Sequence, residues 1–370
     1  MLAERAGGQG ARWSWYAYRV RTLLVAVLAL LGACGDDSGA SPDAGPPARD
    51  LLLATTVRTG GLSDEVAFDV PEGTRSLTVV VTGAPTALYA LGALRMPDGI
   101  DQVMLPAGDP GPTMASSYNV EQIGQMPGML FQSIRLGTFT QIYPYRPGQT
   151  VTAGRASLRV ASDTPGPVEV RVLLAPDDGA RTLHLNVIVV SDVVTVAQPP
   201  TFLDELQALF TPAGIDVVVD QVLPLAGTAF ENITESTEPQ EAPSSMSAML
   251  PALVADRLTG PAFDLFIVES LPAGIGGLSL GTPGPPVRGG YYFGVLVRPS
   301  ANDSQLARVI AHEVCHFLAL QHVQNRGASG QIYPDPLDDT APGQNNLMES
   351  GTRLTADQAF ALTRSWLLQP

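Results

Sequence analysis

The chain has 370 residues, and its 36 acidic and 21 basic residues give a formal net charge of −15 at pH 7. This acidic balance excludes the broad basic surface with which nucleic-acid-binding proteins neutralise phosphates. With only two cysteines in the whole chain, the fold must depend on a hydrophobic core and not on a disulfide framework.

The N-terminal segment has the composition of a signal peptide. Its apolar stretch, Thr22 to Ala33, follows several arginines and is shorter than the roughly 20 apolar residues of a membrane-spanning helix. It ends in Leu31-Gly32-Ala33-Cys34, which resembles a bacterial lipobox, whose cysteine becomes the lipidated first residue. We predict a signal peptide over residues 1–33 and an exported lipoprotein of the cell envelope, on the periplasmic or surface face of the outer membrane. The alternative is an ordinary secretory signal.

The segment after Cys34 predicts a tether followed by a β domain. Residues 34–50 are rich in Gly, Ser, Pro and Asp, a composition typical of flexible linkers. Residues 51–176 contain short β-rich runs between Pro/Gly turns, which predicts an all-β sandwich. The clearest runs are 66–70, 76–82, 155–161 and 168–174, and 175–180 is the predicted linker to the next domain.

From about residue 181 onward, predicted strands and helices alternate. The strands are predicted at 183–190, 215–222, 263–268 and 294–297, and helices at 201–210 and 244–258. The acidic segment 228–245 is predicted as a surface excursion. His184 lies between Leu183 and Leu185, so we interpret it as part of a half-covered sheet face and not as a ligand.

Three of the four histidines lie within eleven residues, in the pattern H-E-x-x-H-x-x-x-x-x-H that starts at His312. A helix places His312 and His316 one turn apart on one face, with Glu313 beside a water on any metal they bind. His322 cannot join them on an unbroken helix, because ten residues would carry it roughly 15 Å along the axis. The chain must therefore leave the helix after His316 and fold back.

This pattern predicts a catalytic zinc site. Three neutral imidazoles, from His312, His316 and His322, leave the fourth tetrahedral position open for water. Glu313 is the predicted general base, which takes a proton from that water and hands it to the leaving amine of a peptide. Helix signals agree, because Asn302, Asp303 and Ser304 offer N-caps before an apolar repeat at helical spacing.

The run resembles the signature of the metzincin zinc peptidases, H-E-x-x-H-x-x-G-x-x-H followed by a methionine turn. Residues 345–350 look like that turn, which implies that Met348 lies beneath the metal. Residues 335–342 are similar to an acidic loop of pappalysin-like metzincins. The resemblance covers about half of the chain. It implies a metzincin-like α/β catalytic domain over 181–370, with a twisted mixed sheet and an active-site helix.

The resemblance also implies a substrate-binding edge strand, which we place at Gly277, Leu278, Ser279 and Leu280. Such an edge pairs with an extended peptide through main-chain hydrogen bonds.

Further along, Thr355 and Gln358 have the spacing of a capping box and predict the start of a final helix.

Two positions depart from the metzincin pattern. Ala319 replaces the glycine that ends the helix with a left-handed turn, a conformation that costs alanine roughly 1–2 kcal/mol. Cys315 stands where a small residue is common, and we interpret it as a buried packing residue. If His322 were not a ligand, Glu349 would be the candidate replacement.

The predicted fold class is therefore α+β and multidomain, with an all-β sandwich before the peptidase-like domain. The predicted function is a lipid-anchored zinc endopeptidase, with Zn²⁺ as cofactor, a peptide or protein substrate, membrane attachment and no nucleic acid. The alternatives are a degenerate peptidase that acts as a lipid-anchored binding or adhesion protein, and a zinc hydrolase of a non-peptide amide. Asp335, Asp338 and Asp339 are candidate Ca²⁺ ligands or a solvated acidic loop.

Overall fold

The computed structural model describes part of the chain, from residue 49 onward. The described residues are 49–370 without 60, 88, 100, 105–136, 192–195, 197–199, 226–229, 234–249, 252, 259, 261, 273, 289–291 and 327–331. The predicted signal peptide, Cys34 and nearly all of the predicted tether lie outside them. No helix among the described residues is long and apolar enough to span a membrane.

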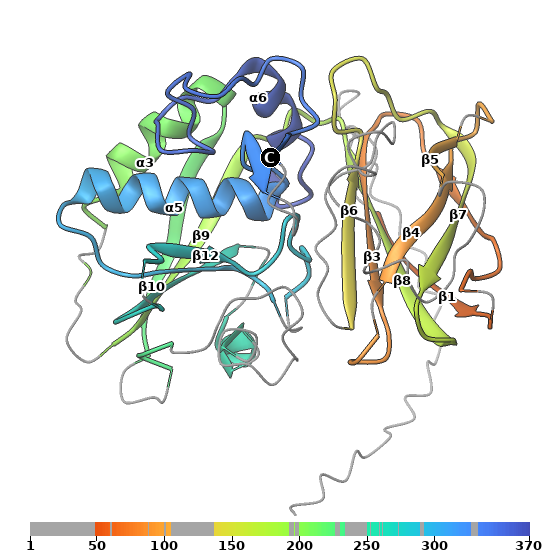
Figure 1. Ribbon diagram of the computed structural model, residues 1–370, viewed down its shortest axis with the longest axis horizontal. Coiled ribbons are helices and arrows are strands. Elements are labelled where there is room, and N and C mark those ends of the chain that lie inside the picture. Colours follow the sequence, from red (N-terminus) through yellow and green to blue (C-terminus); the bar gives the residue numbers. More distant parts are fainter. Residues whose placement is uncertain are drawn as a thin grey trace, which may run out of the picture. The chain divides into compact units, whose positions relative to one another are not determined.

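Two four-stranded antiparallel sheets form the first half of the described chain (Figure 1). Their buried side chains share one core, and strand β8 shows the expected alternation, with Val168, Val170 and Val172 buried and Glu169 exposed. One sheet has the order β1 (Arg49–Val57), β8 (Gly166–Pro176), β3 (Thr74–Thr82), β6 (Thr138–Tyr143). The other has the order β2 (Val66–Val70), β7 (Gly154–Ser162), β4 (Tyr89–Arg95), β5 (Asp101–Met104).

The second half is built on a mixed sheet. Its main path runs β10 (Asp216–Pro224), β9 (Thr182–Val190), β11 (Phe263–Val268), β13 (Val295–Val297), β12 (Gly277–Ser279), and β16 (Leu368–Gln369) pairs with β9. β10, β9, β11 and β13 run parallel to one another, whereas β12 is antiparallel to β13 and lies at the edge, and β16 is antiparallel to β9. Of the edge strand predicted at 277–280, residues 277–279 form β12, and its role in binding substrate stays a prediction.

Helices cover both faces of this sheet. One face packs against α3 (Leu203–Phe210), α5 (Asp303–Leu318) and α6 (Ala356–Leu362) through side chains such as Leu183, Leu185 and Val187 of β9 (Figure 1). The alternate side chains, Ile188 and Val190, pack with the segment around 250–258, which ends in the 3₁₀ turn η2 (Ala255–Arg257). The remaining short elements are η1 (Thr211–Ala213), β14 (Gln324–Arg326) and β15 (Ile332–Pro334).

The observed elements agree with the predicted α+β composition. The helix predicted at 201–210 is α3, and the described end of the helix predicted at 244–258 is helical from residue 250. α6 starts with the predicted capping box of Thr355 and Gln358. The predicted domain boundary at 176–181 stays a prediction, because residues 43–370 form one compact unit by their contacts.

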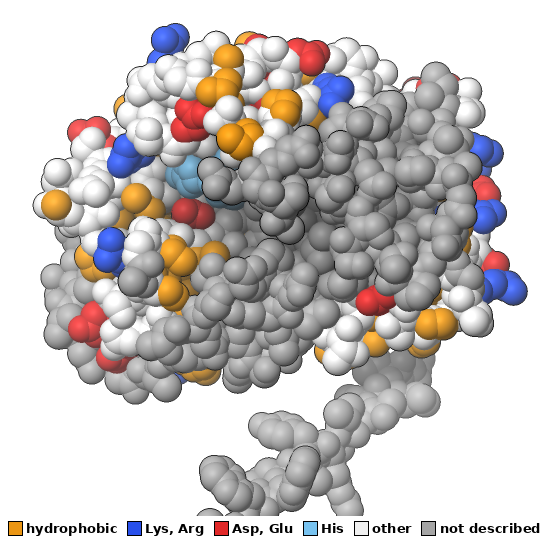
Figure 2. All heavy atoms as spheres, viewed as in Figure 1, with side chains coloured by type: hydrophobic (Ala, Val, Ile, Leu, Met, Phe, Trp, Pro, Cys, Tyr) orange, Lys and Arg blue, Asp and Glu red, His pale blue; other side chains and the backbone are white. Residues whose placement is uncertain are grey.

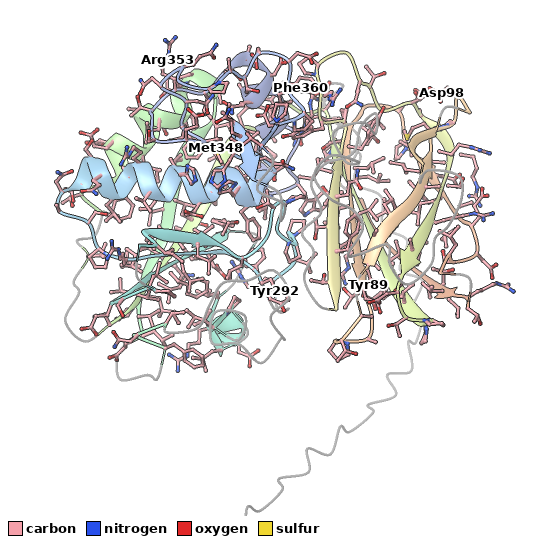
Figure 3. All side chains as sticks on the ribbon, viewed as in Figure 1. Tyr89, Asp98, Tyr292, Met348, Arg353 and Phe360 are labelled. Carbon is pink, nitrogen blue, oxygen red and sulfur yellow. The ribbon has the colours of Figure 1, made fainter. Side chains whose placement is uncertain are left out.

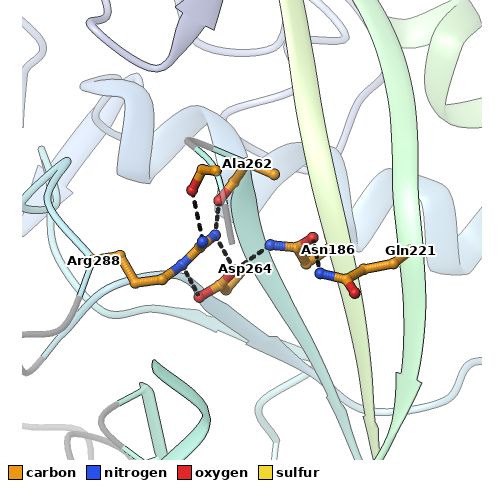
Figure 4. Close-up of polar contacts among 6 residues, drawn as sticks. Asn186, Gln221, Ala262, Asp264 and Arg288 are labelled. Carbon is orange, nitrogen blue, oxygen red and sulfur yellow. Dashed lines mark hydrogen bonds and ion pairs between the residues drawn. The ribbon is translucent and has the colours of Figure 1, made fainter. Parts of the chain in front are cut away.

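A line of polar side chains crosses the buried sheet (Figure 4). Gln221 on β10 donates to the Asn186 amide oxygen at 2.8 Å, and Asn186 on β9 donates to Asp264 Oδ1 on β11 at 2.8 Å. Arg288 Nη2 lies 2.8 Å from the same carboxylate, and its Nη1 donates to the Gly260 carbonyl at 2.7 Å. Burial raises the pKa of Asp264, and the hydrogen bonds and charge around it act in the opposite direction. The ion pair holds the loop after β12 to the central strand β11.

Candidate metal centre

Helix α5 supplies two of the predicted ligands. Asn302 is its N-cap, and the Asn302 side chain accepts a hydrogen bond from the backbone N–H of Gln305 at 2.9 Å. Ala307, Ile310 and other apolar residues of the helix are buried against the sheet. Because His312 and His316 are four residues apart, they lie on one face, with His316 buried and His312 half-buried.

The helix ends at Ala319, the residue that replaces the glycine of the metzincin pattern. Ala319 is the C-cap and has a φ of 129°, in the region that favours glycine. The backbone N–H groups of Ala319 and Leu320 both donate to the carbonyl of Cys315, at 3.0 and 2.8 Å. Ala319 thus adopts a positive φ, as the predicted turn requires, but with a ψ of −5° it lies outside the left-handed helical conformation. The chain turns here, and His322 returns to the helix.

The three imidazoles converge. The Nε2 atom of His316 lies 3.1 Å from those of both His312 and His322, and the latter two are 3.2 Å apart. An ion bound tetrahedrally at the usual Zn–N distance of about 2.0–2.1 Å needs donor atoms roughly 3.3 Å apart. The donor type and the spacing therefore fit a zinc ion, and the cluster is a group that could hold a metal.

Two backbone carbonyls orient the histidines. His312 Nδ1 lies 2.7 Å from the carbonyl oxygen of Leu347, and His316 Nδ1 lies 2.7 Å from that of Leu320. Since a carbonyl only accepts, each Nδ1 must carry the hydrogen, which leaves Nε2 with a lone pair for a metal. Sequence analysis missed Leu347 and Leu320, because a backbone carbonyl leaves no signal in residue type.

Each imidazole of the cluster favours the neutral form, which a metal requires. Burial lowers the pKa of His312, and it lowers the pKa of His322 to about 4, with the neighbouring His312 adding to the shift. Burial also lowers the pKa of His316, and the two neighbouring histidines strengthen that effect. The cluster can therefore bind a cation at neutral pH without first losing protons.

Glu313 is held beside the histidines by the edge strand. Burial raises the pKa of Glu313 to about 8, and the nearby backbone N–H of Ser279 on β12 acts in the opposite direction. A Cβ at Gly277 would lie 2.5 Å from Glu313 Cγ, so only glycine lets the strand approach this closely. A carboxyl group with this pKa can both accept and release a proton near neutral pH.

Met348 is fully buried in the core beside α5 (Figure 3). The turn around it is fastened to α6, because Asn346 and Gln358 exchange amide hydrogen bonds of 3.0 and 3.2 Å. The Asn346 side chain also accepts a hydrogen bond from the Met348 backbone N–H at 2.8 Å. This turn thereby places the Leu347 carbonyl against His312. The sequence did not predict that the turn orients a histidine.

The other candidate ligands lie outside the cluster. Glu349 accepts a hydrogen bond from the Gly343 backbone N–H at 3.2 Å and is not one of the converging side chains. In the part of the chain that the structure describes, the three histidines are the only converging group of three. Asp335, Asp338 and Asp339 therefore do not converge, and Ca²⁺ binding there stays a prediction.

Two further interpretations agree with the structure. Cys315 is fully buried and unpaired, and burial raises the pKa of its thiol above the usual range, as suits a packing residue. His184 is half-buried between the buried residues Leu183 and Leu185, and its Nδ1 lies 2.7 Å from Asp220 Oδ1.

A pocket of about 440 Å³ opens beside the cluster. His312 and Glu313 line it, together with residues 274–277, 308–309, 347 and 349–351. Histidine side chains are visible in a hollow of the surface in Figure 2, with an acidic side chain below them. A ligand in this pocket therefore contacts the residues that the sequence identified as metal ligand and base.

No protein-family model and no curated protein matches the sequence. Among solved structures, archaemetzincin from Methanopyrus kandleri is similar with a TM-score of 0.27 and 12% identity, over 49% of this chain and 87% of that chain. The protein YXIM from Bacillus subtilis has a TM-score of 0.15 and 12% identity, over 55% of this chain and 45% of that chain. Likenesses this weak do not establish a shared fold, so a functional assignment must rest on the site itself.

Proposed function

We propose that the chain is a zinc-dependent endopeptidase of the metzincin type. The observation that carries the proposal is the convergence of three imidazole Nε2 atoms, 3.1–3.2 Å apart, beside the carboxylate of Glu313. His312, His316 and His322 would hold the zinc, and Met348 would support the site from the core. When bound, a zinc ion supplies Lewis-acid chemistry that polarises a carbonyl and lowers the pKa of a water to about 7.

The chain's own residues account for the rest of the reaction. β12 has a free edge among the described strands, so an extended peptide can add to it through main-chain hydrogen bonds. Glu313 takes a proton from the attacking water, whose oxygen bonds to the scissile carbonyl carbon. Glu313 then passes the proton to the amine nitrogen as the C–N bond breaks. The product carboxylate and amine leave without a covalent enzyme intermediate.

We also propose that the protein is exported and lipidated at Cys34, with the enzyme held at the cell envelope. The support is the lipobox-like sequence after an apolar stretch and the Gly/Ser/Pro/Asp-rich residues that follow. The two N-terminal sheets would then lie between the lipid anchor and the catalytic part of the chain.

The decisive experiment compares Glu313→Gln with the parent chain. Loss of the general base should lower kcat/KM on a peptide library by about 100-fold or more, while zinc stays at one ion per chain by metal analysis. His322→Ala should lose the zinc, whereas Glu349→Gln should keep it.

The outcomes separate the candidate functions. Cleavage by Glu313→Gln at the parent rate would contradict the peptidase mechanism. Zinc binding by the parent chain without hydrolysis of any peptide favours the degenerate, binding-protein alternative. Hydrolysis of simple amides but not of peptides favours the non-peptide hydrolase.

A further inference from the structure

The pocket beside Glu313 has three walls from separate parts of the chain. They are the segment that leads into β12, the middle of α5 from Arg308 to Glu313, and the turn around Met348. Because His312 and Glu313 also line the pocket, any side chain that fills it belongs to a residue next to the bond that is cut.

Arg308 is the cation of this pocket. It precedes His312 by four residues, so the two side chains share a helix face, one turn or about 5–6 Å apart. Its Nη1 donates to the carbonyl oxygen of Ser350 at 2.5 Å, which fixes the guanidinium at the pocket wall. No carboxylate among the described residues forms an ion pair with Arg308. The positive charge is thus held in position with no anionic partner in the described part of the chain.

Glu349 is the competing charge, because its carboxylate lines the same pocket. It is already engaged, since it accepts a hydrogen bond from the Gly343 backbone N–H at 3.2 Å. With a divalent ion on three neutral imidazoles, the pocket stays net positive even when both Glu313 and Glu349 are ionised. A negatively charged side chain is therefore the better match than a positive one.

We infer that this pocket selects peptides with aspartate or glutamate next to the scissile bond, with Arg308 binding that carboxylate. The spacing agrees, because successive residues of an extended peptide advance about 3.3 Å, so a neighbouring side chain reaches one helical turn from the metal. Arginine suits the role, since its planar guanidinium pairs with carboxylates through two parallel hydrogen bonds. The inference rests on the proposed peptidase function and names its substrate class.

The test uses the full zinc-loaded chain and matched peptides that differ only in Glu, Gln or Lys beside the cleaved bond. The parent chain should prefer Glu over Gln by about tenfold or more in kcat/KM, the size expected for one charge-assisted hydrogen bond. Arg308→Gln should bring that ratio close to one. Arg353→Gln is the matched control, because Arg353 is exposed, points outward in Figure 3 and does not line the pocket, and it should keep the ratio.

A peptide-library profile of the parent chain makes the test independent of whether the variant folds. Enrichment of Asp and Glu beside the cleaved bond supports the inference. Cleavage with no acidic preference, or with a preference for Lys, overturns the role of Arg308 and leaves the peptidase function intact. If the parent chain cleaves no peptide, the proposed function itself fails.

Discussion

At the scale of single residues, the surroundings shift the pKa values of the side chains in the site. Glu313 and His322 are ordinary titratable residues, yet burial raises the pKa of the first to about 8 and lowers that of the second to about 4. The backbone of Ala319 adopts a φ of 129° because the turn to His322 requires it. The Ala319 N–H donates to the carbonyls of Cys315 and His316, each at 3.0 Å, and so ties the turn to the end of the helix.

Asp335 carries a prediction about pH. Its side chain is 5% exposed, and burial raises its pKa to about 6, although hydrogen bonds from Thr340 and Leu337 favour the charged form. The pKa of Asp335 is higher in the folded than in the unfolded chain. Its contribution to the free energy of unfolding is therefore fully present below about pH 4 and is lost as the pH rises to about 6. Asp335→Asn should therefore gain stability relative to the parent across that window, by up to about 1.4 kcal/mol per pH unit.

The measurement is urea unfolding of the parent chain and the variant at several pH values. Thr340→Val is a second test. Loss of the hydroxyl removes a hydrogen bond that favours the charged carboxylate, so the stability change of this variant should extend to higher pH. A stability difference between Asp335→Asn and the parent that does not change with pH contradicts the argument.

At the scale of elements, the site depends on how closely the edge strand approaches the helix. β12 contacts α5 where Gly277 faces Glu313, and the loop after β12 meets the end of the same helix. Gly284 donates its N–H to the Phe317 carbonyl at 3.0 Å there. The Arg288–Asp264 pair ties this loop to β11 as well. These contacts fix the edge strand β12 relative to both Glu313 on α5 and the core strand β11.

Gly277→Ala tests that close approach. The new methyl would lie 2.5 Å from Glu313 Cγ and 2.9 Å from Val309 Cγ1, so either the base or the strand must move. A displacement of this size should lower kcat/KM by about 10- to 100-fold, while zinc content stays the same.

Gly276→Ala is the matched comparison, because its added methyl would meet Val309 at an ordinary 3.6 Å. It should lose several-fold less activity than Gly277→Ala when both are assayed on the same peptide. Equal losses in the two variants would show that the contact between Gly277 and Glu313 is unimportant.

At the scale of the whole molecule, the proposed lipid anchor makes a localisation prediction. In a bacterial host that processes lipoproteins, the parent chain should incorporate labelled fatty acid and sediment with membranes. Cys34→Ser should remove both properties, since the thiol that forms the thioether is absent. Cys315→Ala is the control, because that cysteine is buried in the core and should leave lipid labelling unchanged. Labelled fatty acid on Cys34→Ser would exclude Cys34 as the attachment site.

The sequence by itself determined the features that repeat over a few residues. Helical spacing predicted α5 and the pairing of His312 with His316, with Asn302 as one of three candidate N-caps. The turn at Ala319 was implied by the resemblance to the metzincin pattern. Alternation likewise predicted strands such as β8 and β9, with His184 on the half-covered face.

Only the tertiary structure decided which distant groups meet. The Leu347 carbonyl reaches His312 across 35 residues, the Ser279 N–H reaches Glu313, and Asn186 pairs with Asp264 across 78 residues. Arg308 also becomes a pocket residue only because the turn after Met348 folds against α5. Local periodicity is set by backbone geometry and is therefore readable along the chain. These contacts depend instead on how whole elements pack. Nearly every residue has a backbone donor and acceptor, so the residue type does not show which of them will contact the site.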